Sequence, residues 1–228
     1  MPTKYTYLLV DFFCVIFPII LSFVSKAKFY KQVKYFIAPC VLTASFFITW
    51  DLIFTQLNIW SFNPKYVLGI YFYNLPLEET LFFICIPYAS VFTYFLVKSF
   101  LDLNRFKTVA TYFSWAIMAL LFSVAIYNYT KLYTSITFFI LGTFLLILTM
   151  KKAAYLPNFF LAYLFILIPF FISNGILTGS LINEPVVIYN NAQNLGIRML
   201  TIPFEDIFYG MLLVLMNVSL YEKRLSLG

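Results

Sequence analysis

Long apolar stretches alternate with short polar segments along almost the whole chain. Seven of these stretches are about twenty residues long, which is the length that an α-helix needs to cross a bilayer. They leave no segment large enough for a separate soluble domain. The pattern therefore predicts an all-α integral membrane protein with about seven transmembrane helices. The expected spans cover residues 5–24, 35–54, 76–97, 109–127, 132–150, 159–176 and 202–221.

The composition supports a membrane protein and excludes an ordinary soluble one. Of the 228 residues, 63% are hydrophobic and only 11% are charged. A soluble fold of this length could not bury so much apolar surface. The first apolar stretch is too long for a signal-peptide core and has no small-residue cleavage site after it, so we interpret it as a membrane span.

The basic residues are distributed unevenly between the two sides of the expected spans. Eleven of the fifteen Lys and Arg residues follow the first, third, fifth and seventh spans. Cytoplasmic loops are enriched in basic residues, so the N-terminus is predicted outside and the C-terminus in the cytoplasm of a cell (inner) membrane. The net charge of +6 then needs no nucleic-acid partner. The eleven are Lys26, Lys28, Lys31, Lys34, Lys98, Arg105, Lys107, Lys151, Lys152, Lys223 and Arg224, and the others are Lys4, Lys65, Lys131 and Arg198.

Several kinds of chemistry have no residues to carry them. The chain has no histidine, which excludes imidazole-based acid–base catalysis and imidazole metal ligands. Cys14, Cys40 and Cys85 all fall within spans without CxxC spacing, as expected of packing residues. The glycines form neither a dinucleotide fingerprint nor a P-loop. We therefore expect no metal and no nucleotide cofactor.

The chain contains an internal repeat with an offset of 127 residues. This shift aligns Leu68-Gly69-Ile70 with Leu195-Gly196-Ile197, and Pro76-Leu77-Glu78-Glu79 with Pro203-Phe204-Glu205-Asp206. An offset of four spans preserves direction across the membrane, so the pattern predicts two parallel three-helix repeats joined by a linking helix. We expect a first repeat over residues 1–104, and the linking span with the second repeat over residues 105–228. Both acidic motifs would then lie at the same depth.

The acidic residues fall into two groups. Asp102, Glu184 and Glu222 lie outside the expected spans or at the end of the last one, where solvated charges are ordinary. The other six lie within spans or at their edges, where ionisable groups are costly and are usually functional. These six are Asp11, Asp51, Glu78, Glu79, Glu205 and Asp206.

The two acidic motifs, Pro-Leu-Glu-Glu and Pro-Phe-Glu-Asp, have two interpretations. Proline and acidic residues both suit the first turn of a helix, so the motifs could simply start two helices. However, one acid is enough for that purpose, and each motif carries two. Adjacent carboxyl groups in a partly dry site favour one neutral member, which can donate a proton while an ionised neighbour accepts one. We therefore select Glu78, Glu79, Glu205 and Asp206 as catalytic candidates.

Aromatic and polar residues near these motifs are candidates for binding a substrate. Phe82 and Tyr209 each lie four residues after an acid, on the same helix face. Electron-rich rings can stabilise a carbocation, although an interfacial aromatic belt explains most aromatic residues of a membrane protein. The full set of binding candidates is Asp11, Asp51, Trp60, Asn63, Phe82, Phe83, Asn190 and Tyr209.

These motifs resemble a known family. The stretch Ile59-Trp60-Ser61-Phe62-Asn63-Pro64 and the stretch Leu75-Pro76-Leu77-Glu78-Glu79 resemble the first half of the membrane-embedded carotenoid (lycopene) cyclases. Ile202-Pro203-Phe204-Glu205-Asp206 resembles the second half. The family occurs as two small subunits or as one fused chain, and this chain resembles the fused form. We expect no phytoene synthase domain, unlike in the fungal fusions.

The resemblance implies a lycopene β-cyclase, an isomerase of the intramolecular lyase kind that acts in carotenoid biosynthesis. A proton adds to the terminal double bond of a ψ-end, the next double bond attacks the resulting cation, and a different proton is lost. The outcome is a β-ionone ring with no net redox change, so no cofactor is required. The expected partners are a hydrophobic carotenoid such as lycopene and the lipid bilayer, while homo-oligomers and contacts with other carotenoid enzymes stay open.

The sequence is also compatible with other functions. Duplicated spans with buried acids also suit a proton-coupled transporter. Within the resemblance, the chain could act on other carotenoid ends, or trap the same cation with water as a hydratase does. A retinal photoreceptor is excluded, because the last span contains no lysine for a Schiff base.

Overall fold

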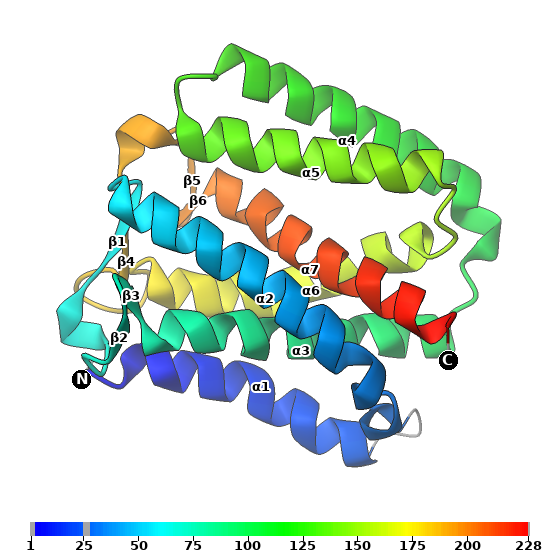
Figure 1. Ribbon diagram of the computed structural model, residues 1–228, viewed down its shortest axis with the longest axis horizontal. Coiled ribbons are helices and arrows are strands. Elements are labelled where there is room, and N and C mark those ends of the chain that lie inside the picture. Colours follow the sequence, from blue (N-terminus) through cyan, green and yellow to red (C-terminus); the bar gives the residue numbers. More distant parts are fainter. Residues whose placement is uncertain (1–2, 25–27, 228) are drawn as a thin grey trace.

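Seven long helices lie side by side and form one bundle (Figure 1). The structure is a computed structural model that describes residues 3–24 and 28–227, so Lys26 lies outside the described residues. Seven helices in these ranges are long and apolar enough to span a membrane, which confirms the predicted all-α membrane fold. They are α1 (Thr6–Val24), α2 (Val33–Gln56), α3 (Leu77–Phe100), α4 (Lys107–Tyr127), α5 (Leu132–Met150), α6 (Leu156–Leu177) and α7 (Phe204–Leu225).

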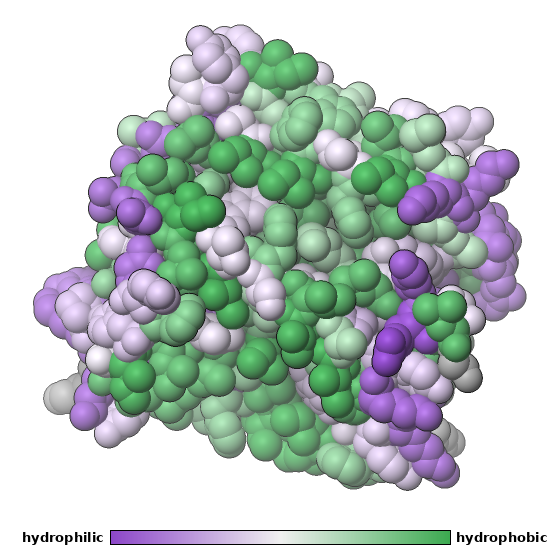
Figure 2. Space-filling model, in the orientation of Figure 1, coloured by the Kyte–Doolittle hydropathy of each residue, from purple (hydrophilic) through white to green (hydrophobic). Residues whose placement is uncertain are grey.

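The surface of the bundle matches a bilayer setting. Figure 2 shows hydrophobic side chains across the middle of the molecule and hydrophilic ones gathered at its two ends. Apolar side chains such as Phe13 and Ile168 are more than half exposed. In water this exposure would be unfavourable, whereas in lipid it carries no such cost. The chain is thus a multi-pass membrane protein.

Short strands gather at one end of the bundle, which we call the strand end; it lies at the left in Figure 1. β2 and β3 form one antiparallel hairpin before α3, and β5 and β6 form another before α7. β1 and β4 pair antiparallel with each other and so join the two halves of the chain. The strands are β1 (Trp60–Phe62), β2 (Tyr71–Phe72), β3 (Leu75–Pro76), β4 (Val187–Tyr189), β5 (Arg198–Met199) and β6 (Ile202–Pro203).

Short 3₁₀ helices complete the connections. At the strand end they are η2 (Pro64–Tyr66) and η4 (Asn191–Gln193), which occupy equivalent places in the two halves. Each is capped by an asparagine, because the side chains of Asn63 and Asn190 accept hydrogen bonds from backbone N–H groups two residues on. At the opposite end they are η1 (Phe29–Lys31) and η3 (Asn104–Phe106).

The duplication predicted from the sequence is present in the structure. α1–α3 and α5–α7 follow the same order of elements, and α4 links them. Ser61 of β1 lies opposite Ile188 of β4, which is its equivalent at an offset of 127 residues. Antiparallel pairing of equivalent residues is what a twofold axis through the strand pair produces. The two three-helix repeats are therefore parallel, as expected.

Ion pairs at the two ends of the bundle differ in burial. Lys65 and Glu184 form an exposed pair 2.8 Å apart at the strand end, where hydrogen bonding lowers the pKa of Glu184 and raises that of Lys65. At the opposite end, Lys98 of α3 lies 2.6 Å from Glu222 of α7, and the Tyr94 hydroxyl donates to the same carboxylate. The expectation of a solvated Glu222 was wrong, because this contact between helices leaves its side chain only 14% exposed.

Candidate active site

Each acidic motif lies where a hairpin turns into a helix. The Leu77 N–H donates to the Ile70 carbonyl at 2.8 Å, and the Phe204 N–H donates to the Ile197 carbonyl at 3.0 Å. These bonds fold each hairpin back over the first turn of α3 or α7. The two acids of each motif occupy that turn. Because consecutive helical residues are rotated by about 100°, the two carboxyl groups of a motif point in different directions.

The first acid of each motif holds the hairpin in place. The Glu78 carboxylate accepts a hydrogen bond of 2.7 Å from the Leu68 N–H, and Glu205 accepts one of the same length from the Leu195 N–H. Thr134 of α5 also donates to Glu205, at 2.5 Å. Both glutamates are fully buried. One oxygen of each carboxyl group thus accepts from a loop N–H, and the other oxygen is buried without a hydrogen-bond partner among the described residues.

The second acid of the first motif meets a carboxyl group from another helix. Glu79 accepts a hydrogen bond of 2.5 Å from the Tyr7 hydroxyl of α1. Its carboxyl group also lies within hydrogen-bonding reach of Asp51 on α2. The Tyr209 hydroxyl of α7 donates to Oδ1 of Asp51, at 2.7 Å. Since neither carboxylate can donate, a hydrogen bond between Asp51 and Glu79 requires one proton on the pair.

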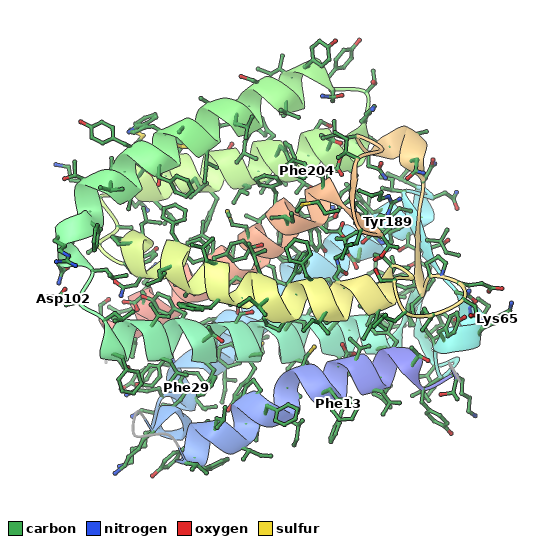
Figure 3. The ribbon with its side chains drawn as sticks, turned by 180° about the vertical axis from the view of Figure 1, so that it is seen from behind. Phe13, Phe29, Lys65, Asp102, Tyr189 and Phe204 are labelled. Carbon is green, nitrogen blue, oxygen red and sulfur yellow. The ribbon has the colours of Figure 1, made fainter. Side chains whose placement is uncertain are left out.

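The second acid of the second motif is surrounded by neutral donors. Asp206 accepts hydrogen bonds from the Tyr133 hydroxyl at 2.5 Å, the Asn174 amide at 2.7 Å and the Tyr189 hydroxyl at 2.9 Å. Burial, and next the charge of Asp206, raises the pKa of Tyr189 well above its usual value, so this phenol keeps its proton at neutral pH. Tyr189 lies toward the strand end of the bundle (Figure 3). Together these three donors provide partners for both carboxyl oxygens of Asp206.

The carboxyl groups of Asp51, Glu79 and Asp206, which we call the carboxyl cluster, all line one cavity of about 800 Å³. The cavity is bounded mainly by α1, α3, α6 and α7, and both repeats contribute to it. Away from the cluster its walls are largely apolar, with residues such as Ile86 and Leu213. One cavity thus combines titratable groups at the strand end with a long hydrophobic interior.

Aromatic rings surround the carboxyl cluster. The Trp60 ring lies 5.2 Å from that of Tyr133 and 6.1 Å from those of Tyr189 and Tyr209, measured between centroids. All four of these side chains line the cavity. Their π-faces can stabilise a cation that forms beside them.

The structure brings half of the candidate residues to the cavity. Glu79, Asp206, Asp51, Trp60, Phe82 and Tyr209 line it. Glu78 and Glu205 bind backbone in the hairpins, Asn63 and Asn190 cap 3₁₀ helices, and Phe83 packs on Phe47. Asp11 is buried, and neither of its carboxyl oxygens has a hydrogen-bond partner among the described residues.

Sequence reasoning missed four hydrogen-bond donors of the cluster. They are Tyr7, Tyr133, Asn174 and Tyr189. Tyr7 and Tyr133 are 126 residues apart, one residue less than the repeat offset of 127. Allowing this shift in the alignment would have identified them as equivalent tyrosines. Nothing local distinguishes Asn174 or Tyr189. Within the ranges that the structure describes, no group of three or more His, Cys, Asp or Glu side chains is arranged to hold a metal ion.

The fold and the site together define a duplicated seven-helix membrane protein with a carboxyl cluster in an apolar cavity. The sequence profile of one family, described as lycopene cyclase, matches the chain twice, over residues 4–97 and 130–223. The two matches contain the two repeats, and the chain belongs to the lycopene cyclase family. Searches of curated proteins and of solved structures found no match. Membership indicates a carotenoid cyclase that acts on a hydrophobic carotenoid in a membrane.

Proposed function

We propose that the protein is a lycopene β-cyclase that closes the ψ-ends of lycopene into β-ionone rings by proton transfer alone. The observation that carries this proposal is the carboxyl cluster at one end of an apolar cavity. The reaction needs one proton donated and a different one removed, and both steps suit carboxyl groups. The chemistry is redox-neutral, so the proposed mechanism uses no cofactor.

The Asp51–Glu79 pair is the proposed proton donor. A carboxyl pair that shares one proton can deliver it to the terminal double bond of the polyene, and the Tyr7 and Tyr209 hydroxyls can stabilise the charge left behind. Protonation leaves a tertiary cation at the end of the chain. The next double bond attacks this cation, which forms the carbon–carbon bond of the ring and moves the positive charge onto the ring.

Asp206 is the proposed proton acceptor. Its three hydrogen-bond donors stabilise its carboxylate form, which can stabilise the cyclic cation and then remove a proton from the adjoining ring carbon. Loss of that proton leaves the ring double bond and a neutral pigment. Before the next turnover the Asp51–Glu79 pair regains a proton from water and Asp206 releases one to water. The rings of Trp60 and Tyr189 lie nearby and can stabilise the cation before the proton is lost.

Glu78 and Glu205 are proposed as positioning residues. Each fixes a hairpin against the start of the helix that carries Glu79 or Asp206. Asp11 has no step in this mechanism. The proposed catalytic carboxyl groups are therefore one acid from each motif, Glu79 and Asp206, together with Asp51. The sequence had suggested all four motif acids.

Expression in a lycopene-accumulating bacterium tests the proposal. We expect pigment extracts to contain carotenoids with β-rings when analysed by chromatography and mass spectrometry. A Glu79→Gln control expressed to the same level should leave lycopene unchanged. Hydrated acyclic carotenoids in place of rings would favour a hydratase, and rings formed only on longer carotenoids would favour a different substrate. Unchanged lycopene with the wild-type protein would contradict the proposal.

A further inference from the structure

The two repeats place equivalent helix faces beside their acids, but with side chains of very different size. Asp51 of α2 and Asn174 of α6 are equivalent, because each contacts the second acid of its own repeat's motif. This equivalence corresponds to an offset of 123 residues between α2 and α6. It aligns Trp50 with Ser173.

The same comparison between α3 and α7 finds a second difference. At the offset of 127 residues, Phe83 of α3 aligns with Gly210 of α7. The first half therefore has two large aromatic residues, Trp50 and Phe83, where the second half has a serine and a glycine.

In the first half these aromatic residues fill the space between helices. The rings of Trp50 and Phe47 stack with centroids 5.8 Å apart, and Phe83 lies 5.7 Å from Phe47. All three residues are buried. None of them lines the cavity.

In the second half the equivalent space is open. Ser173 and Gly210 both line the cavity, together with Phe170, the equivalent of Phe47. A Cβ atom on Gly210 would lie 3.4 Å from the Tyr163 hydroxyl and 3.6 Å from the Phe170 ring, so a larger side chain at 210 would extend into this space. The cavity thus extends over Ser173 and Gly210, at the places where the first half has Trp50 and Phe83.

The open groove reaches the lipid-facing side of the bundle. Phe13 of α1 and Ile172 of α6 line the cavity and are also 56% and 61% exposed. The opening therefore lies between α1 and α6. Along α3 the lining runs from Glu79 to Thr93, which corresponds to about 21 Å at the rise of an α-helix. An extended lycopene molecule is longer than this groove, so its second end group would remain outside.

We propose that this cavity is the single polyene-binding groove of the molecule, that Ser173 and Gly210 set its capacity, and that the two ends of a linear carotenoid enter it one at a time from the side. The proposal rests on the proposed function for the identity of the polyene. Its binding readout below does not require that rings form.

Substitutions that fill the groove provide the test. We would purify Gly210→Ala, Gly210→Leu, Gly210→Phe and Ser173→Trp in detergent and measure lycopene bound per folded protein by absorbance. Binding should fall with side-chain size and drop about tenfold or more for Phe and Trp, within the usual cost of overpacking. Ser45→Trp makes the same change on an exposed face of α2 and should bind lycopene as the wild type does.

The outcomes separate this proposal from the proposed function. Wild-type protein that binds lycopene without forming rings would overturn the cyclase assignment, while the substitution series would still report on the groove. If folded Gly210→Phe or folded Ser173→Trp binds as much lycopene as the wild type, the proposal that Ser173 and Gly210 set the capacity of the groove is wrong. The two positions lie on different helices, so either folded variant is sufficient.

A pulse of labelled lycopene followed by an excess of unlabelled lycopene tests the one-end-at-a-time claim. The labelled pigment should appear first as the monocyclic product and should persist after the excess is added, because each end requires separate binding. Labelled bicyclic product that forms without any released monocyclic intermediate would contradict this claim.

Discussion

Consecutive carboxyl groups in one helical turn have different surroundings in this protein. Glu78 accepts a hydrogen bond from a backbone N–H in the hairpin, whereas Glu79 faces the cavity and meets Tyr7 and Asp51. The same division separates Glu205 from Asp206. At the scale of single residues, the proposal therefore gives proton transfer to one member of each pair and loop anchoring to the other.

Amide substitutions test this division. Glu79→Gln and Asp206→Asn cannot exchange a proton, so each should lower the rate of ring formation per folded enzyme by roughly two to four orders of magnitude. Glu78→Gln and Glu205→Gln retain an acceptor for the backbone N–H but lose its charge. They should cost roughly 1 kcal/mol of unfolding free energy, with a much smaller loss of rate. The measurements are cyclised pigment per folded enzyme and thermal stability of the same samples.

Glu184→Gln is the matched control for this set. It makes the same change at the exposed pair with Lys65, away from the cavity, and should leave the rate unchanged. Equal inactivation of folded Glu78→Gln and folded Glu79→Gln would contradict the division of roles, and would favour the four-carboxylate set expected from the sequence.

The sequence could identify the acids at this scale but not their directions. The cost of burying an acid and the duplication single out Glu78, Glu79, Glu205 and Asp206 together, because both features appear in composition and spacing. The direction of each side chain depends on the hairpin that folds back over the helix start. The contacts of Tyr189 and Asn174 with Asp206 depend on packing between distant elements, which no local pattern encodes.

At the scale of elements, each hairpin that precedes an acidic motif has two positions with positive φ, a glycine just before its first strand and a bulky residue in its turn. Gly69 and Gly196 have φ values of +84° and +75°. Tyr73 and Leu200, also equivalent, adopt positive φ within the hairpin turns. A bulky residue rarely takes this conformation, so its presence at the same place in both halves indicates a turn held by the surrounding structure.

An alanine at either glycine should strain its hairpin. A Cβ atom at Gly69 or Gly196 would meet nothing within 4 Å, so the cost is the backbone conformation alone. We expect each variant to lose about 1–2 kcal/mol of stability, seen as a lower melting temperature. Gly175→Ala, at a helical glycine without positive φ, should not lower it. An unchanged melting temperature in Gly69→Ala and Gly196→Ala would mean that these turns are not strained by a side chain.

Helices were more predictable than hairpins. The predicted spans fall on the seven helices, with ends that differ by a few residues, because twenty-residue apolar runs leave no other stable structure in lipid. The strands have only two or three residues each. Such short pairings follow from tertiary contacts, and their sequences carry no alternation long enough to indicate them.

At the scale of the whole molecule, the direction of insertion stays a prediction. Most basic residues lie at the end of the bundle opposite the strands, in agreement with the hydrophilic ends seen in Figure 2. Reporter fusions after Lys28, Arg105, Lys152 and Arg224 should therefore read cytoplasmic, and fusions after Lys65 and Arg198 external. A cytoplasmic signal after Lys65 would reverse the proposed orientation.

The duplication also predicts that the chain can be divided. Residues 1–104 and 105–228 contain one acidic motif each, and β1 and β4 pair across the two halves. Co-expressed as separate chains, they should reassemble into active enzyme, as judged by co-purification and ring formation. Each half alone should be inactive, because the carboxyl cluster needs both. Full activity of residues 1–104 alone would show that Asp206 is dispensable.

In the proposed mechanism, carboxyl groups in one cavity close the ring by exchanging protons. Cyclisation by purified enzyme in D₂O, without added flavin or nicotinamide, measures this exchange. The enzyme is first equilibrated in D₂O, and in the proposed cycle the donor pair regains its proton from solvent. Each ring formed should therefore gain one deuterium from the proton donor and lose one hydrogen from the substrate. Mass spectrometry should therefore find one deuterium per ring in the product. Rings that form only with a reduced cofactor, or that carry no deuterium, would rule out the proposed proton exchange.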